Sequence, residues 1–197
     1  LKNRQNFTNK IISFILAFAL LASSIVVQFA VTAADNVWDG SVADSYAGGN
    51  GTDIDPYLIS TPEQLARMIK HDVIDTRTGN IENASVNKYY KLTTDIYLND
   101  VSNSNWKNMS PKSWYTFEST AYRFCGNLDG DGHTVYGIYQ ADGNPYGGLI
   151  PVVDAWGKER SVKNVKISDA YIVPTNTSWV AAGAVAGRVY GGNSKEF

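Results

Sequence analysis

Four short apolar stretches in the C-terminal half of the chain decide the fold. They are Thr134-Val-Tyr-Gly-Ile138, Gly148-Leu-Ile-Pro-Val-Val153, Val162-Lys-Asn-Val-Lys-Ile167 and Ala182-Gly-Ala-Val-Ala-Gly187, and clusters of Gly, Asn and Asp separate them every 14 to 20 residues. No helical period runs through them. Short strands with turns at near-regular spacing are typical of a β-sandwich or of a stacked solenoid.

Small residues inside these stretches favour the solenoid over the sandwich. They are Gly147, Gly148, Gly183, Ala184, Ala186 and Gly187. Stacked coils approach each other too closely for larger side chains at such positions. We therefore expect a mainly β protein in which residues 122–197 form solenoid-like coils.

The region before the coils predicts a small strand-helix-strand unit. Residues 34–60 are a loop-rich lead-in that ends in a short extended piece, and residues 61–121 are expected to pack on the solenoid. Thr61-Pro-Glu-Gln64 has the pattern of a helix start, with Thr as N-cap, Pro at the first position and Gln three residues after the cap. A helix of about ten residues should follow. Residues 88–98 predict one strand, and residues 99–120 predict a long ordered loop.

Residues 1–33 have the order of a secretory signal peptide. A basic stretch from Lys2 to Lys10 precedes an uncharged apolar run, and small residues lead up to Ala33. We expect cleavage after Ala33. The apolar run is long enough to cross a bilayer, so an uncleaved anchor is the alternative, and membrane contact is expected only in that case. Either way the remainder is secreted or associated with the cell surface.

The composition of the 197 residues excludes several classes of protein. An apolar content of 44% is too high for a disordered chain, and a single cysteine cannot build a disulfide scaffold. The formal net charge is −2, and it becomes −5 when the three basic residues of the signal segment are left out. A mildly acidic chain offers no basic field for nucleic acid, which we exclude as a partner.

Several stretches together resemble bacterial secreted proteins that carry the GLUG motif. They are Val37-Trp-Asp-Gly-Ser41 with Ala47-Gly-Gly-Asn-Gly-Thr52, Pro56-Tyr-Leu-Ile-Ser-Thr-Pro-Glu-Gln-Leu65, Tyr89-Tyr-Lys-Leu-Thr-Thr-Asp-Ile-Tyr-Leu98, Phe124-Cys-Gly-Asn-Leu-Asp-Gly-Asp-Gly-His-Thr-Val-Tyr-Gly-Ile138, Tyr146-Gly-Gly-Leu-Ile150 and Gly183-Ala-Val-Ala-Gly187. The resemblance implies a right-handed parallel β-solenoid-like fold in a secreted or wall-associated protein. Such segments occur in surface adhesins, in cellulosome-type proteins and beside immunoglobulin A-cleaving peptidases. Pro151 departs from the motif, which usually has Gly there.

The chain is expected to be the front of a longer protein. Only two or three coils are visible in the sequence, whereas solenoids generally need at least three coils and a polar cap. Residues 191–197 are too short to cap an apolar coil. We therefore expect further domains C-terminal to residue 197, and an apolar end that associates without them.

Metal binding has little support in the sequence, and no cofactor is expected. Asp129 and Asp131 are weak calcium candidates, because alternate carboxylates can point at one ion. An EF-type loop starting at Asp129 would need an acidic residue at position 140, which is Gln140. The favoured interpretation is a tight turn with positive φ at its glycines. Zinc lacks a ligand cluster, because the chain has two histidines and only Cys125, a thiol we expect to be buried.

Tryptophans supply the candidate binding residues. Trp106, Trp114, Trp156 and Trp179 lie in polar, turn-like surroundings, where an exposed indole face suits a sugar ring. The alternative is that they pack loops onto the core. No catalytic residue is assigned, although a lyase site can be assembled on paper from Asp129, Asp131, Asp154, Glu159 and Arg160.

The sequence as a whole predicts a secreted bacterial surface module. We expect a non-enzymatic, adhesin-like or glycan-binding scaffold whose partner is a polysaccharide or a host or cell-surface glycan. The alternative is a noncatalytic N-terminal part of a secreted polysaccharide-degrading enzyme of cellulosome type, or a β-helix polysaccharide lyase. The domain that follows in the full-length gene would separate these hypotheses.

Overall fold

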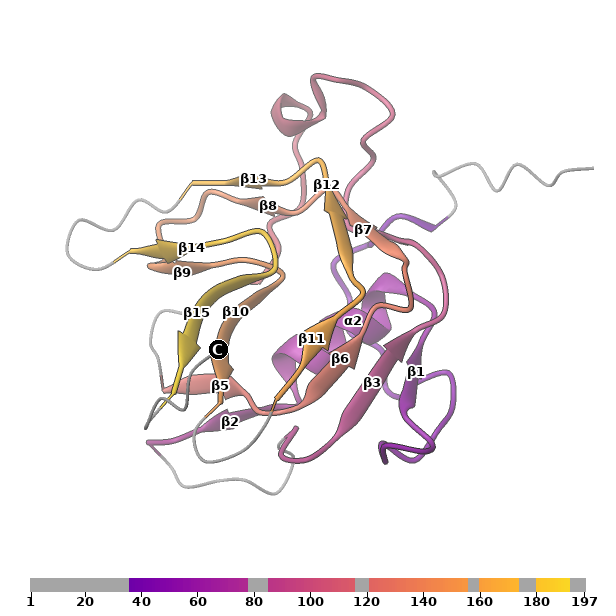
Figure 1. The fold of residues 1–197 in the computed structure, drawn as a ribbon. Coiled ribbons are helices and arrows are strands. Elements are labelled where there is room, and N and C mark those ends of the chain that lie inside the picture. The colour runs from indigo at the N-terminus through magenta and orange to yellow at the C-terminus, as the bar shows by residue number, and fades with distance from the viewer. Residues whose placement is uncertain (1–35, 78–84, 116–120, 156–159, 174–179, 192–197) are drawn as a thin grey trace, which may run out of the picture. The chain divides into compact units, whose positions relative to one another are not determined.

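The computed structural model describes residues 36–77, 85–115, 121–155, 160–173 and 180–191 (Figure 1). The chain divides into two units, residues 1–32 and 33–197, and every described residue lies in the second. The predicted signal segment 1–33, with its cleavage site after Ala33, lies outside the described residues.

The described strands wind into coils that lie one on another. The first coil holds β3 (Tyr89–Leu92), β4 (Ile96–Tyr97) and β5 (Tyr122–Phe124). The second holds β6 (Asn127–Asp129), β7 (Thr134–Tyr136), β8 (Tyr139–Gln140), β9 (Tyr146–Gly147) and β10 (Ile150–Asp154). The third holds β11 (Val162–Lys163), β12 (Lys166–Ser168), β13 (Tyr171–Ile172), β14 (Ala181–Ala182) and β15 (Ala186–Tyr190).

Parallel pairing joins each coil to the next. All five strands of the second coil pair with their counterparts in the third, and β3, β4 and β5 pair with β6, β7 and β10. The predicted fold class is therefore confirmed: the protein is mainly β, and its coils form a β-solenoid of about three turns.

The register gives the length of one turn. Tyr139 pairs with Tyr171 and Ile150 pairs with Ala186, so the turn from the second coil to the third takes 32 to 36 residues. The apolar stretches that recur every 14 to 20 residues therefore mark successive sides of one coil and not successive coils. Stretches 134–138 and 148–153, for example, both lie in the second coil.

Corners interrupt some of the stretches that the sequence predicts as continuous. Residues 88–98, predicted as one strand, form β3 and β4 with a bend between them, and residues 162–167 form β11 and β12. At the second corner Asn164 has a φ of 55°, in the left-handed region. Asn tolerates this conformation better than most residues, so the chain turns there and starts the next side of the coil.

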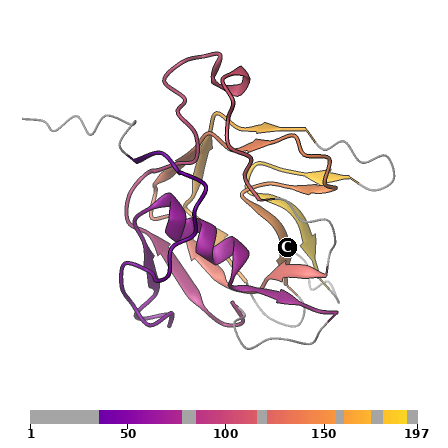
Figure 2. The same ribbon diagram turned by 180° about the vertical axis from the view of Figure 1, so that it is seen from behind.

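One helix lies across the N-terminal end of the stack. The helix α2 (Pro62–Lys70) starts as predicted, since the side chain of Thr61 accepts a hydrogen bond from Gln64 N. The Gln64 side chain reaches one residue further back than expected and accepts from Ser60 N at 2.8 Å. The third coil faces the viewer in Figure 1, and α2 lies in front when the molecule is seen from behind in Figure 2.

Two further strands join the helix to the coils. The strand β1 (Tyr57–Ile59) pairs in parallel with β3 and so extends the stack by one strand. The strand β2 (Val73–Asp75), which the sequence pattern did not predict, pairs antiparallel with β5. The long loop is confirmed over its described residues, 99–115, where a short 3-10 helix spans Trp106–Asn108.

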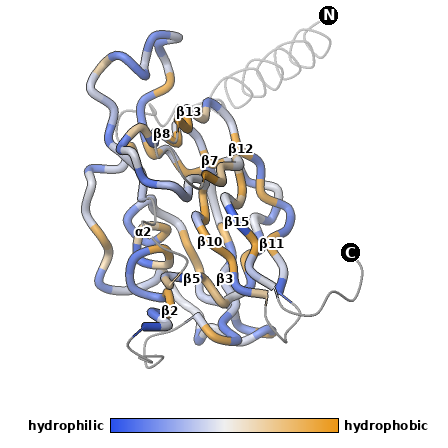
Figure 3. The backbone as a smooth tube through the Cα atoms, turned by 90° about the vertical axis from the view of Figure 1, so that its left-hand side faces the viewer, coloured by the Kyte–Doolittle hydropathy of each residue, from blue (hydrophilic) through white to orange (hydrophobic). Residues whose placement is uncertain are grey.

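The core runs through the coils and ends against α2. Hydrophobic positions recur along the stacked strands in Figure 3, and Leu65 and Met68 of α2 join the same buried cluster as Leu128 and Ile150. Small residues allow the close stacking, as predicted. A Cβ atom on Gly187 would lie 2.4 Å from the carbonyl oxygen of Gly147 in the coil below.

Candidate functional site

Two of the four tryptophans predicted to contact a glycan are buried. Trp114 is 1% exposed, its ring lies 5.1 Å from that of Trp38, and its indole nitrogen donates to Leu149 O at 3.0 Å. Trp106 is 7% exposed and packs edge-on against Tyr139. Both therefore pack loops onto the solenoid, and the expectation that they contact sugar is corrected. Trp156 and Trp179 lie outside the described residues.

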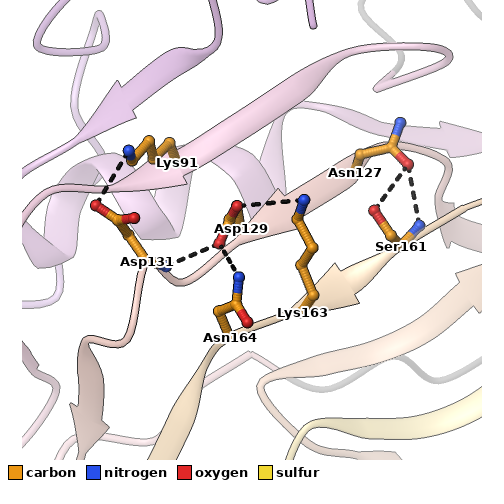
Figure 4. A network of polar contacts seen from close by, with 7 residues as sticks. All are labelled: Lys91, Asn127, Asp129, Asp131, Ser161, Lys163 and Asn164. Carbon is orange, nitrogen blue, oxygen red and sulfur yellow. Dashed lines mark hydrogen bonds and ion pairs between the residues drawn. The ribbon is translucent and has the colours of Figure 1, made fainter.

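The two calcium candidates are engaged in a ladder of polar contacts across the coils (Figure 4). Lys91 of β3, Asp129 of β6 and Lys163 of β11 occupy one register position in successive coils. The Asp129 carboxylate lies 3.4 Å from Lys163 Nζ, and the Asp131 carboxylate lies 3.0 Å from Lys91 Nζ. Each carboxylate thus has its own ammonium partner, and the charges alternate along the stack.

The turn beside these carboxylates has the predicted positive φ at Gly132 but not at Gly130, and its second left-handed residue is Asp131. Asp131 and Gly132 have φ values of 50° and 83°, and Asp131 N donates to the Asp129 carboxylate at 2.9 Å. Burial alone would raise the pKa of the Asp129 carboxyl, but hydrogen bonds from Asp131 and Asn164 and the Lys163 ammonium outweigh it and lower this pKa. Among the described residues, no three His, Cys, Asp or Glu side chains are grouped so as to hold a metal ion.

The described residues of the lyase site that the sequence assembles have other partners. Asp154 pairs with Arg123 at 3.2 Å, and Arg160 donates to Asn87 at 3.3 Å, while Glu159 lies outside the described residues. Cys125 is buried as expected, and burial raises the pKa of its thiol to about 11. The four described residues of this set, Asp129, Asp131, Asp154 and Arg160, thus each contact a residue outside it.

A pocket of about 530 Å³ lies where the lead-in, α2 and the first coil meet. The lead-in supplies residues of the turn 44–49 and Tyr57 of β1. The helix region supplies Arg67 on α2 and, just after the helix, His71 and Asp72. The first coil supplies Lys88 and Tyr90 at its start. None of these residues is among the sequence-predicted site residues. They are separated by up to 46 positions in the chain, so only the tertiary fold brings them together.

Three tyrosines form one wall of this pocket. Tyr46 and Tyr57 are stacked, with ring centroids 4.6 Å apart and an angle of 21° between the planes. Tyr90 meets Tyr46 edge-on at 5.6 Å. The lead-in folds back on itself to make this stack: Gly49 has a φ of 80°, and a Cβ atom there would lie 1.8 Å from Pro56 O. Glycine at this position is what allows Tyr46 to reach Tyr57.

Asp72 fixes two of the tyrosine hydroxyls. Its carboxylate accepts hydrogen bonds from the hydroxyl of Tyr46 and, at 2.9 Å, from that of Tyr90. Burial, followed by the negative charge of Asp72, raises the pKa of both tyrosines well above the ordinary value. The two phenols are therefore held neutral and in fixed orientation.

Two cations border the tyrosine stack. The guanidinium carbon of Arg67 lies 5.6 Å from the ring centroid of Tyr46, and Lys88 Nζ lies 5.7 Å from that of Tyr57. Arg67 Nη1 donates to Ala43 O at 3.0 Å, which ties the lead-in to the helix. The pocket therefore combines aromatic rings with fixed donors and acceptors.

The sequence carries only weak signals for this site. The Gly-rich segment 47–52 predicts a turn, and the helix start at Thr61 sets the register that places Arg67 on α2. Neither pattern shows that Tyr46, Tyr57 and Tyr90 meet. Among the described residues, no helix combines the length and the apolar content that crossing a bilayer requires.

Comparisons with known proteins give relatives of low identity. A protein named "Putative Gly-rich membrane protein" from Evansella cellulosilytica is 29% identical over 183 residues, which cover 91% of this chain and 18% of that protein. "Halomucin" from Haloquadratum walsbyi is 30% identical over 157 residues, which cover 79% of this chain and 2% of that protein. No family model and no solved structure matches the chain, so the resemblance to GLUG-motif proteins stays a prediction. The chain is thus similar to a small part of much longer proteins.

Proposed function

We propose that this chain is a non-enzymatic module of the bacterial cell surface that binds a glycan in the pocket beside Tyr46, Tyr57 and Tyr90. The observation that carries the proposal is the convergence of stacked tyrosine rings, charged side chains and a cavity of about 530 Å³. This volume lies in the range of small-molecule sites. One relative is named a membrane protein, which loosely fits a surface location.

The chemistry of the pocket suits a sugar. A pyranose ring has apolar C–H faces that pack on aromatic rings, and a rim of hydroxyls that needs donors and acceptors. Tyr46 and Tyr57 are already stacked and Asp72 already fixes the Tyr46 hydroxyl, so little side-chain entropy remains to be lost when a ring settles against them. Asp44 and His71 line the same pocket and are exposed, so they are accessible to sugar hydroxyls.

The same geometry supports binding over proton abstraction. A tyrosine that acts as a base needs a lowered pKa, whereas Asp72 and burial raise the pKa of Tyr46 and Tyr90. The Asp72 carboxylate is itself occupied by the two hydroxyls. These residues hold a ligand better than they deprotonate one.

The test is a glycan array followed by titration calorimetry on the full chain. Tyr57→Ala should weaken binding of each recognised glycan about tenfold, which corresponds to about 1.4 kcal/mol. Tyr97→Ala is the matched control, because Tyr97 and Tyr136 are stacked at 4.7 Å but Tyr97 does not line the pocket. Circular dichroism checks that both variants keep the fold, and Tyr57→Leu, which retains more of the volume, serves if Tyr57→Ala does not. Absence of binding to any glycan, or equal binding by the pocket variant and the control, would overturn the proposal.

A further inference from the structure

The two cations of the pocket have no anionic partner within the part of the chain that the structure describes. None of the ion pairs there includes Arg67 or Lys88. Within the described residues, the Arg67 guanidinium donates to Ala43 O. Its buried Nε has no hydrogen-bond acceptor there. A guanidinium that is half-buried with an unused donor gains more from an anion than an exposed one does.

The acidic residues of the pocket do not fill this role. The Asp72 carboxylate accepts the hydroxyls of Tyr46 and Tyr90, and Asp44 is exposed. Arg67 and Lys88 instead lie over the two rings of one stack, Arg67 over Tyr46 and Lys88 over Tyr57. A ligand that packs on this stack therefore lies beside two positive charges.

On the basis of the proposed function, we infer that the sugar bound here carries a carboxylate, as a uronic acid residue of an acidic polysaccharide does. The carboxylate would be held by Arg67 and Lys88, with the ring against the tyrosines and a hydroxyl donating to Asp44. Guanidinium suits this role, because its planar donors match the geometry of a carboxylate. The chain as a whole is acidic, so the preference depends on these two local cations.

The experiment compares matched pairs of oligosaccharides on the full chain. Oligogalacturonate is titrated beside its methyl ester, and oligoglucuronate beside the corresponding neutral glucose oligomer. The acidic member of at least one pair should bind about tenfold or more tightly than the neutral member. Raising the salt concentration should reduce this ratio, because salt screens the attraction.

Variants of Arg67 and Lys88 test whether these two cations cause the preference for acidic oligosaccharides. Lys88→Met and Arg67→Met should each lower the ratio of acidic to neutral binding at least threefold, while Lys70→Met should leave it unchanged, since Lys70 does not line the pocket. Lys88→Met keeps the test decisive if the loss of the contact to Ala43 O disturbs the fold of Arg67→Met.

The outcomes separate this inference from the proposed function. Equal binding of acidic and neutral members, weakened by Tyr57→Ala, would overturn the carboxylate preference and leave the glycan-binding pocket standing. A preference for acidic members that both cation variants retain would also overturn it. Absence of binding to every oligosaccharide in the pairs and on the array would overturn both.

Discussion

Replacement of Gly187 by Ala tests how closely the third coil stacks on the second. A Cβ atom at Gly187 would lie 2.4 Å from Gly147 O, 2.7 Å from Pro151 O and 3.0 Å from Ala181 O. All three are backbone atoms, which cannot rotate away. The φ of Gly187 is outside the left-handed region, so an alanine there is sterically disfavoured by its neighbours and not by its own backbone.

The expected cost follows from this overlap. Cβ atoms do not approach other heavy atoms closer than 3.0 Å, so the two coils must separate by roughly 0.6 Å at this point. Overpacking of this kind costs about 1–3 kcal/mol, while alanine returns about 0.4–1 kcal/mol by restricting the unfolded chain. Gly191→Ala is the matched control, because its Cβ would meet nothing within 4 Å. The difference between the two variants should be about 2 kcal/mol.

Two measurements on the full chain read this difference. Urea unfolding followed by circular dichroism reports the whole fold. Hydrogen exchange at the amides of Leu149 and Ile150 reports the contact between the coils, because these amides donate to Ala184 O and Val185 O of the third coil at 3.0 Å each. Their exchange in Gly187→Ala should be about 30-fold faster than in Gly191→Ala. Equal exchange and equal unfolding free energies in the two variants would refute the stacking distance.

Three further predictions concern the ladder, the core and the thiol. Asp129→Asn should lower the unfolding free energy by about 0.5–1 kcal/mol at neutral pH. Because the folded-state pKa of Asp129 is lowered, the difference in unfolding free energy between the chain and this variant is present above about pH 4 and disappears as the pH falls through that pKa. Urea unfolding at pH 7 and pH 3 would show this change. Leu128→Ala should lower the unfolding free energy by about 3 kcal/mol, because Leu128 is fully buried between β3 and β11. Val162→Ala should lower it by about 1 kcal/mol, because Val162 is half-buried in the third coil. A larger loss for Val162→Ala than for Leu128→Ala in urea unfolding would contradict the coil assignment. Cys125 should react with a thiol reagent at pH 8 only after unfolding, since it is 3% exposed and its pKa is raised to about 11, and rapid labelling of the native chain would count against its burial.

Local chemistry accounts for what the sequence predicts correctly. The Thr61 cap and the left-handed φ of Gly132 each depend on a few neighbouring residues. The solenoid is also readable from the sequence, because close stacking demands small residues such as Gly187 and Gly147 at fixed places in each coil. These features need no knowledge of which coil lies on which.

The tertiary structure decides exposure, pairing and the pocket. Trp114 has polar neighbours in the sequence and yet is buried, because the loop that carries it folds back onto the second coil and its indole reaches Leu149. Asp129 and Asp131 have the spacing of a metal loop, but the register brings lysines from the coils on either side to them.

The pocket shows the limit of the sequence most clearly. Tyr46, Arg67 and Tyr90 belong to the lead-in, the helix and the first coil, and no period or motif links them. By itself the sequence determined the turns, the helix start and a stack of short β-strands, because each of these depends on contacts between near neighbours or on a repeated spacing. Only the tertiary structure determined which side chains face a common cavity, because that depends on how the lead-in and α2 close the end of the stack.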